Sequence, residues 1–212
     1  MKIRSAVGVI DAIDEDLAWR KRELTRTKFL CGQARDHDRS VLNRASVVLA
    51  YAHLEGFLKC AVRAYCSFLN SQGLRYAEVT PSLVALTARG RLVTAERANS
   101  LGVHIDLVSF LLGDLSAAVD LPADDIAGSL GTVNTDLLGQ LARLMGFDSS
   151  RYEKRWALID ERLVRNRHLV AHGERIEYLD SEVEDIRELA LSLIEDLRTD
   201  IQNSVVLGSY RR

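Results

Sequence analysis

The spacing of apolar residues predicts helices over most of the chain. Across residues 5–30, apolar side chains recur at steps of three, four and seven residues, and charged residues occupy the opposite face. The same kind of spacing continues over residues 40–70, which predicts a second helix of roughly 45 Å, long enough to span a whole domain. No segment alternates apolar and polar residues for long enough to require a β-sheet.

Turn and cap signals divide the remaining chain into shorter helices. They are expected at residues 80–98, 104–119, 134–144, 150–172 and 180–206. Gly90 marks a candidate break, residues 120–133 form the loosest segment, and Gly173 is suited to end the helix before it. The sequence therefore predicts an all-α bundle of five to seven helices, in a single domain over residues 1–212.

Composition narrows the class of protein further. Hydrophobic residues make up 47% of the 212 residues and charged residues 27%, which is ordinary for a globular chain. The formal net charge of −2 argues against a generally basic coat for nucleic acid, although it does not exclude a local basic site. The longest apolar run, Val47 to Tyr51, is far shorter than the ~18 residues of a membrane span.

The cysteines and the N-terminus bear on the cellular compartment. Cys31, Cys60 and Cys66 are odd in number and lack C-x-x-C spacing, so neither a disulfide framework nor a zinc knuckle is expected. The first apolar stretch is broken at Asp11, which is too early for a signal peptide. We expect a soluble, cytoplasmic protein with no membrane partner.

The densest polar segment lies on the predicted helix 150–172. On a helical wheel, four apolar residues fall within one narrow arc: Trp156, Ile159, Leu163 and Val170. Four polar residues share the opposite face: Glu161, Arg165, His168 and His172. Arg167 falls near the apolar arc, where an unpaired guanidinium costs several kcal/mol. Either Arg167 has a buried acidic partner, or its stripe is an interface.

Two ordinary readings compete at this helix. Arg and His near a helix C-terminus complement the macrodipole, worth about 0.3–1 kcal/mol each. The histidines at i and i+4, His168 and His172, also suit a metal, but no third ligand stands nearby and the HExxH order is absent. No metal site and no cofactor are therefore predicted.

The same residues carry a resemblance. Residues 167–172, RHLVAH, resemble the R-x4–6-H motif of HEPN-domain nucleases, and the pattern also fits when it starts at Arg165-Asn166. Residues 171–174, AHGE, are similar to the family's common ending of this motif. The departure lies after Arg167, where the branch usually has Asn and this chain has His168. This leaves open whether Arg165 and Asn166 take over part of the role.

The resemblance extends beyond the motif. It includes residues 16–24, DLAWRKREL, residues 51–59, YAHLEGFLK, and residues 158–163, LIDERL. Together they are similar to the RiboL-PSP-HEPN-like branch of small stand-alone nucleases from bacterial defence and toxin–antitoxin loci. The resemblance implies a HEPN-like helical bundle and a metal-independent endoribonuclease that cleaves RNA by 2′-OH attack. It also implies a homodimer, with a cognate antitoxin or sensor protein as a candidate partner.

The resemblance implies roles for the site residues. His172 is expected to be the acid or base and Arg167 the clamp on the scissile phosphate, with His168 as an auxiliary polar group. Arg165, beside Asn166, is a second clamp or a contact to the RNA backbone. On the wheel Arg167 and His172 point about 140° apart, so a two-fold dimer is needed to bring both kinds of side chain into one cleft.

Other polar residues keep two interpretations each. Glu55 either orients Arg167 or His172, or is an ordinary partner of Lys59 at i+4. Trp19 and the basic triplet at 20–22 form either part of an RNA-binding surface or a solvated helix face, and His53 is expected to be structural. Two alternatives to the nuclease remain: a non-catalytic module that binds nucleotide or RNA, and a regulatory helical adaptor.

Overall fold

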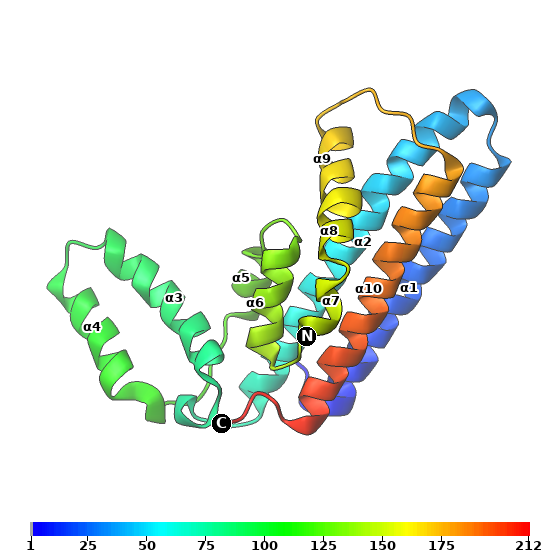
Figure 1. Cartoon of the computed structure of the whole chain (residues 1–212). Helices are drawn as coiled ribbons and strands as arrows, with labels where there is room; N and C mark the ends of the chain where they lie inside the picture. Colours follow the sequence, from blue (N-terminus) through cyan, green and yellow to red (C-terminus); the bar gives the residue numbers. More distant parts are fainter. Residues whose placement is uncertain (1) are drawn as a thin grey trace.

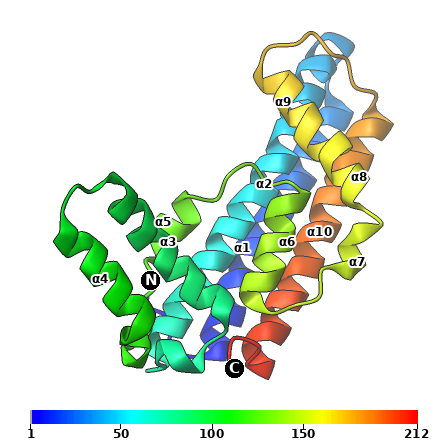
Figure 2. The ribbon, with the colours of Figure 1, turned by 60° about the vertical axis from the view of Figure 1, so that its left-hand side comes forward.

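Three long helices form the body of the protein. The computed structural model describes residues 2–212. Helices α1 (Ala6–Gln33), α2 (Asp36–Ser71) and α10 (Asp180–Leu207) lie side by side along most of their length (Figures 1 and 2). Because α10 returns beside α1 and α2, residues far apart in the sequence share one apolar core.

The remaining helices are shorter and pack along this body or project from it. They are α3 (Pro81–Arg97), α4 (Leu101–Leu112), α5 (Ala123–Gly128), α6 (Thr135–Met145), α7 (Ser150–Glu153), α8 (Trp156–Leu158), the π-helix η3 (Ile159–Arg165), α9 (Asn166–Ala171), and the 3₁₀ turns η1 (Tyr76–Glu78) and η2 (Asp114–Ser116). Between residues 2 and 212 six helices have eleven or more residues, and no strand is present beyond two isolated bridges. The prediction of an all-α bundle is confirmed; the six long helices match the predicted number, whereas α5 and the division of residues 150–172 into several short helices were not predicted.

Several predicted boundaries differ from the observed ones. Helix α3 runs through Gly90 without a break, because its flanking residues keep the helical hydrogen bonds. The helix expected at 104–119 begins at Leu101 and ends at Leu112. The segment 120–133 contains α5, whose Ile126 and Ala127 are buried in the core, so burial outweighs the turn-forming composition around it.

Helix α2 is the central helix of the bundle. Its sixteen buried residues lie on several faces, because α1, α10, α5 and α9 pack around it. It is also the one helix in the described chain that is long and apolar enough to cross a membrane. Of that apolar stretch 56% is buried inside the protein, as expected for the core helix of a bundle.

A polar cluster joins α1 to α2 inside the bundle. Arg20 is only 7% exposed; its guanidinium contacts both carboxylate oxygens of Asp16 at 2.6 and 3.0 Å and lies 3.3 Å from Nδ1 of His53. The other ring nitrogen of His53 lies 3.0 Å from Glu23, and Trp19 packs edge-on against the same ring. The cluster satisfies a buried cation with a carboxylate one helical turn away.

Gly56 makes room for this cluster on α2. A Cβ at this position would lie 2.6 Å from Nη1 of Arg20, closer than atoms can approach. Arg20 is held in place by Asp16 and His53, so it cannot move aside without losing these contacts. The glycine therefore serves close packing between side chain and helix, not a turn.

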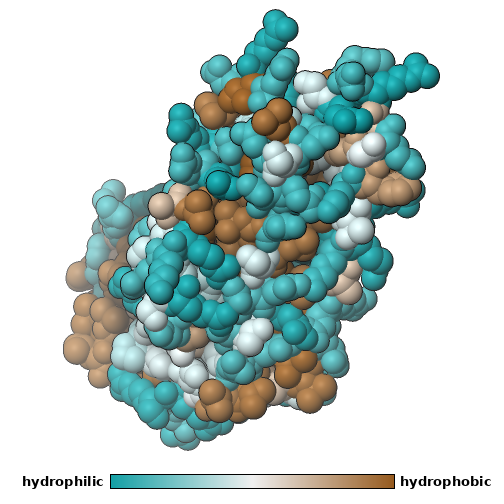
Figure 3. All heavy atoms as spheres, turned by 45° about the vertical axis from the view of Figure 1, so that its right-hand side comes forward, coloured by the Kyte–Doolittle hydropathy of each residue, from teal (hydrophilic) through white to brown (hydrophobic). Residues whose placement is uncertain are grey.

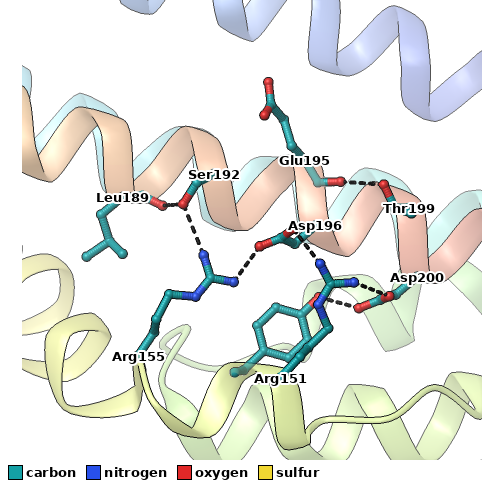
Figure 4. Close-up of polar contacts among 9 residues, drawn as sticks. Arg151, Arg155, Leu189, Ser192, Glu195, Asp196, Thr199 and Asp200 are labelled. Atoms are coloured by element: carbon teal, nitrogen blue, oxygen red, sulfur yellow. Dashed lines mark hydrogen bonds and ion pairs between the residues drawn. The ribbon is translucent and has the colours of Figure 1, made fainter.

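Ion pairs to α10 hold the chain just before the motif segment. Arg151 in α7 contacts Asp196 at 2.5 Å and Asp200 at 2.7 Å (Figure 4). Arg155 also reaches Asp196, and the hydroxyl of Tyr152 donates to Asp200. These contacts tie α7 to the middle of α10 and set where the following helical segment starts.

Helices α3 and α4 form a hairpin that projects from the bundle (Figures 1 and 2). Its base is attached near the C-terminus, where the amide of Thr80 donates to the carbonyl of Tyr210 at 2.9 Å. Thr80 precedes Pro81 at the start of α3, close to the predicted start of this helix at residue 80, and its side chain makes no capping hydrogen bond. The free end of the hairpin points away from the base.

Replacing Gly56 by Ala is expected to destabilise the protein. Gly→Ala in a helix normally stabilises by about 0.5–1 kcal/mol, but here the added methyl group displaces Arg20, and overpacking costs about 1–3 kcal/mol. The free energy of unfolding, measured by urea denaturation, should therefore fall. Gly139→Ala in α6 is the matched control, since no described atom lies within 4 Å of the added Cβ, and it should be neutral or stabilising. A stabilised Gly56→Ala protein would contradict the packing role.

His53 should make stability depend on pH. Burial, followed by the Arg20 charge, lowers the pKa of His53 below its usual value near 6.5. The unfolded chain then binds more protons in this range, so stability is full above about pH 6.5 and is lost as pH falls towards the folded-state pKa. His53→Gln should flatten this slope in urea melts between pH 7 and pH 5. A matched His37→Gln change at an exposed site should keep the wild-type slope, and equal slopes in all three proteins would disprove the assignment.

Candidate functional site

The motif segment is not the single helix that periodicity predicts. Where a continuous α-helix was expected from Ser150 to His172, the structure has two short helical turns, then the π-helix η3, then α9. A π-helix bonds i to i+5, so it adds a residue to the turn and rotates the following residues about the axis. Asp160 in η3 accepts hydrogen bonds from the amide and hydroxyl of Thr135, at 3.4 and 3.0 Å, which ties η3 to the start of α6.

The end of the segment follows the sequence signals. Gly173 adopts φ +81°, and its amide bonds to the carbonyl of Val170, while that of Glu174 bonds to Leu169. This left-handed glycine ends α9 directly after His172. The prediction of Gly173 as the stop is confirmed.

Arg167 lies against an aromatic ring of the central helix. The guanidinium carbon is 4.9 Å from the ring centroid of Tyr51 in α2, within the range of a cation–π contact. Arg167 is half-buried and makes no ion pair with any residue between 2 and 212. No direct acidic partner is therefore found there, and the interface alternative stays a prediction. The stacked cation keeps its N–H donors free for an anion.

Tyr51 is itself held firmly. It is 1% exposed, and its hydroxyl accepts a hydrogen bond from the amide of Val133 at 2.8 Å. Burial raises the pKa of Tyr51; the Val133 bond partly offsets this, and the nearby carboxylate of Glu55 adds to the rise. The phenol thus stays neutral, and the segment leading into α6 fixes the platform on which Arg167 lies.

Glu55 continues the same face of α2, one turn after Tyr51. Its carboxylate pairs with Nζ of Lys59, 2.5 Å away, and it helps to raise the pKa of Tyr51. The pair with Lys59 at i+4 is therefore observed, whereas no contact between Glu55 and Arg167 or His172 is found among residues 2–212, and an orienting role stays a prediction. The order along this face is the guanidinium of Arg167, the ring of Tyr51, the carboxylate of Glu55 and the ammonium group of Lys59.

His168 and His172 are exposed on α9. Their ring centroids are 4.1 Å apart at an interplanar angle of 51°, so the two rings share one patch of surface as the wheel predicts. No carboxylate among residues 2–212 lies within ion-pair distance of the ring nitrogens of His168 or His172. Both imidazoles are thus open to solvent at the end of the motif segment.

Arg165 and Asn166 face away from Tyr51. They line a pocket of about 470 Å³ between η3, α9 and α10, together with Tyr178 and Asp185. Asn166 is engaged there, because its Nδ2 donates to the carbonyl of Arg162 at 2.9 Å and its Oδ1 accepts from Tyr178 at 3.3 Å. The two arginines of the double motif thus occupy different sides of the segment, and only Arg167 meets the polar face of α2.

Other residues that the sequence suggested for the site make contacts within the fold instead. Arg20 is buried, so the triplet at 20–22 is not one continuous basic surface, and Lys21 pairs with Glu195 on α10. His53 is 2% exposed within the α1–α2 cluster, in line with a structural role. No role for Tyr51 was predicted from the sequence. The feature that could have indicated one is an aromatic hydroxyl four residues before Glu55, on the same helix face.

Within the described chain, no group of three or more His, Cys, Asp or Glu side chains is placed to hold a metal ion. The geometry places the guanidinium of Arg167 on the ring of Tyr51. It also places two exposed imidazoles, His168 and His172, side by side on the same short segment. Such a set can bind a phosphate and exchange protons with groups beside it.

Comparison with known proteins agrees with the helical bundle described above. The model of the family described as RiboL-PSP-HEPN matches residues 15–203, nearly the whole chain. Neither curated proteins nor solved structures yield a match. Because the family match covers α1 through most of α10, this protein belongs to the RiboL-PSP-HEPN family.

Proposed function

We propose that the protein is a metal-independent endoribonuclease of the HEPN type, acting as a toxin or defence effector. Arg167 carries the proposal. It is a half-buried guanidinium without an ion-pair partner among residues 2–212, and it is held on the ring of Tyr51 in the same short segment as the exposed motif histidines. Keeping a cation unpaired is costly unless an anion meets it, and the scissile phosphate of RNA is such an anion.

The reaction needs a base, an acid and cations. His172 takes the 2′-OH proton or protonates the 5′-oxygen that leaves, since imidazole titrates near working pH. The 2′-oxygen attacks phosphorus, the P–O5′ bond breaks, and a 2′,3′-cyclic phosphate remains on one product. Arg167 binds the phosphate oxygens as negative charge develops on them. His168 supports His172 from the neighbouring turn, and Arg165 contacts the backbone further along the RNA.

A homodimer completes this site. One α9 supplies one arginine and one histidine that point to different sides of a short helix, so acid, base and clamp do not converge within one chain. A two-fold axis beside α9 brings a second set to the same cleft. The RNA target, and an antitoxin or sensor that controls the enzyme, belong to the same proposal as partners.

The proposed chemistry can be tested on total cellular RNA in EDTA. We expect cleavage by the wild-type protein, and a loss of about 10²-fold or more in both Arg167→Ala and His172→Ala, because each removes a group acting on the transition state. Arg165→Ala and His168→Ala are the matched variants on the same helix, and they should lose less. Products are read on a denaturing gel, with 2′,3′-cyclic ends checked by phosphatase resistance.

The same assay separates the alternatives. RNA binding that persists in His172→Ala, with no cleavage by any wild-type preparation, supports a non-catalytic binding module. Cleavage that continues in both Arg167→Ala and His172→Ala refutes the assigned site. A larger loss in Arg165→Ala than in Arg167→Ala would assign the motif arginine to residue 165.

Tyr51 should matter through its ring more than through its hydroxyl. Tyr51→Leu removes the cation–π platform, worth about 0.5–2 kcal/mol, and should reduce cleavage by roughly 2- to 30-fold. Tyr51→Phe keeps the ring and loses only the Val133 hydrogen bond, so its activity should stay closer to wild type. Thermal melts of both proteins control for folding. Equal losses in the two variants at equal stability would show that the ring does not position Arg167.

A further inference from the structure

The backbone hydrogen bonds change partner at Asn166, the residue directly before Arg167. In an α-helix the amide of residue 166 would donate to the carbonyl of Arg162, four residues earlier. At the end of η3 this amide donates to the carbonyl of Leu163 instead. The carbonyl of Arg162 accepts from the side-chain Nδ2 of Asn166 at 2.9 Å. The side chain of Asn166 therefore supplies a hydrogen bond that its backbone gives up where the π-helix passes into α9.

The amide group of Asn166 is held from its other end as well. Its Oδ1 accepts a hydrogen bond from the hydroxyl of Tyr178 at 3.3 Å. Because a backbone carbonyl only accepts, the partner at Arg162 fixes which end of the amide carries the nitrogen. Both polar atoms are thus engaged, and the side chain lines the pocket between η3, α9 and α10, not the face that meets Tyr51. Asn166 is placed to support the helix rather than to bind a substrate beside Arg167.

Tyr178 is anchored to the central helix. It belongs to the connecting segment, residues 173–179, which runs from α9 to α10 (Figure 1). Its carbonyl accepts from Nδ2 of Asn43 in α2 at 3.0 Å, and the same nitrogen donates to Asp180 at 2.8 Å. Asn43 is 3% exposed and Tyr178 is 9% exposed. Buried polar groups of α2 and of the connecting segment therefore lead to Asn166.

Tyr178 is also the buried anchor of the connecting segment. Of residues 173–179, Tyr178 is buried, Ile176 is half-buried and the others are exposed. A further hydrogen bond, from Nη2 of Arg44 to the carbonyl of Glu174 at 2.9 Å, lies at the surface. This end of the molecule, at the top in Figure 1, is mostly hydrophilic on the face drawn in Figure 3, with separate apolar groups. Removing only the hydroxyl of Tyr178 would leave its ring in place and release the amide of Asn166.

We propose that Asn166 and Tyr178 are positioning residues, which hold the helix so that the guanidinium of Arg167 lies on the ring of Tyr51. Successive residues of a helix are turned by about 100°, so the direction of Arg167 follows from how the helix is wound at Asn166. Without the hydrogen bond from Asn166 to the carbonyl of Arg162, the junction can rewind towards an α-helix, and Arg167 turns off the ring. The inference rests on the proposed function, in which Arg167 binds the scissile phosphate.

The guanidinium signal of Arg167 in ¹⁵N NMR spectra tests this positioning without any RNA. An aromatic ring displaces the signals of protons that lie over its face, and the guanidinium carbon is 4.9 Å from the ring centroid of Tyr51. The Nε–H signal, identified by its loss in Arg167→Lys, should therefore differ between the wild type and Tyr51→Leu. We expect Asn166→Ala and Tyr178→Phe each to move it most of the way to its position in Tyr51→Leu.

Tyr76→Phe is the matched control for the loss of a buried hydroxyl. The hydroxyl of Tyr76 also bonds to a carbonyl, that of Asp120 at 3.1 Å, but it does so in η1, before the hairpin. The Arg167 signal should stay at its wild-type position in this variant. Circular dichroism melts show that each protein is folded. An Arg167 signal that stays in place in folded Asn166→Ala and Tyr178→Phe overturns the proposal.

Cleavage kinetics show whether Asn166 acts through Arg167. Asn166→Ala should lower kcat by roughly 10-fold, less than Arg167→Ala does, because the guanidinium is misplaced but still present. The double variant Asn166→Ala/Arg167→Ala should be no slower than Arg167→Ala alone, since a positioning residue has no effect once the group that it positions is gone. A further loss of activity in the double variant overturns the proposal.

The two measurements separate this inference from the proposed function. If the Arg167 signal moves in Asn166→Ala and Tyr178→Phe while the wild type cleaves no RNA, the positioning is supported and the nuclease function is not. If cleavage depends on Arg167 but its signal responds to neither change, the nuclease function stands and the positioning is overturned.

Discussion

Enclosure of α2 within the bundle is the constraint on which the rest of the structure depends. Other helices pack on several of its faces, so the polar groups on those faces need partners inside the protein. The polar groups on two faces of α2 have different kinds of partner. Towards α1, His53 joins Arg20, and Gly56 leaves room for the guanidinium. Towards α9, the ring of Tyr51 lies against Arg167 of the motif segment.

This arrangement explains why one short block, residues 51–59, serves both structure and site. Residues two apart on a helix point in nearly opposite directions, whereas residues three or four apart share a face, so Tyr51 and His53 separate while His53 and Gly56 stay together. The α1 face is closed: carboxylate, guanidinium and imidazole satisfy one another. The α9 face is left incomplete, because Arg167 rests on a ring and has no anion among the described residues. This unpaired cation, beside the paired ones of the α1 face, is the reason that the candidate site is placed at α9.

Much of the fold could be predicted from the spacing of apolar residues alone. Helices α1, α2 and α10 follow from their apolar periodicity, and Gly173 follows from its conformational freedom at a helix end. The exposure of His168 and His172 also followed from the wheel. The π-helix η3 did not, because its extra residue per turn depends on tertiary contacts such as the bond between Asp160 and Thr135. Periodicity assumes one fixed angle per residue and cannot register such a change.

For the site, the sequence by itself determined the candidate side chains: two arginines, two histidines and a carboxylate in blocks similar to those of a nuclease family. Only the tertiary structure decided how they divide. It set Arg167 on Tyr51 and turned Arg165 and Asn166 towards α10. It also buried Arg20, which the sequence shows only as part of a basic run. The physical reason is that local spacing sets the direction of a side chain along its own helix, whereas the partner it meets is set by how separate helices pack.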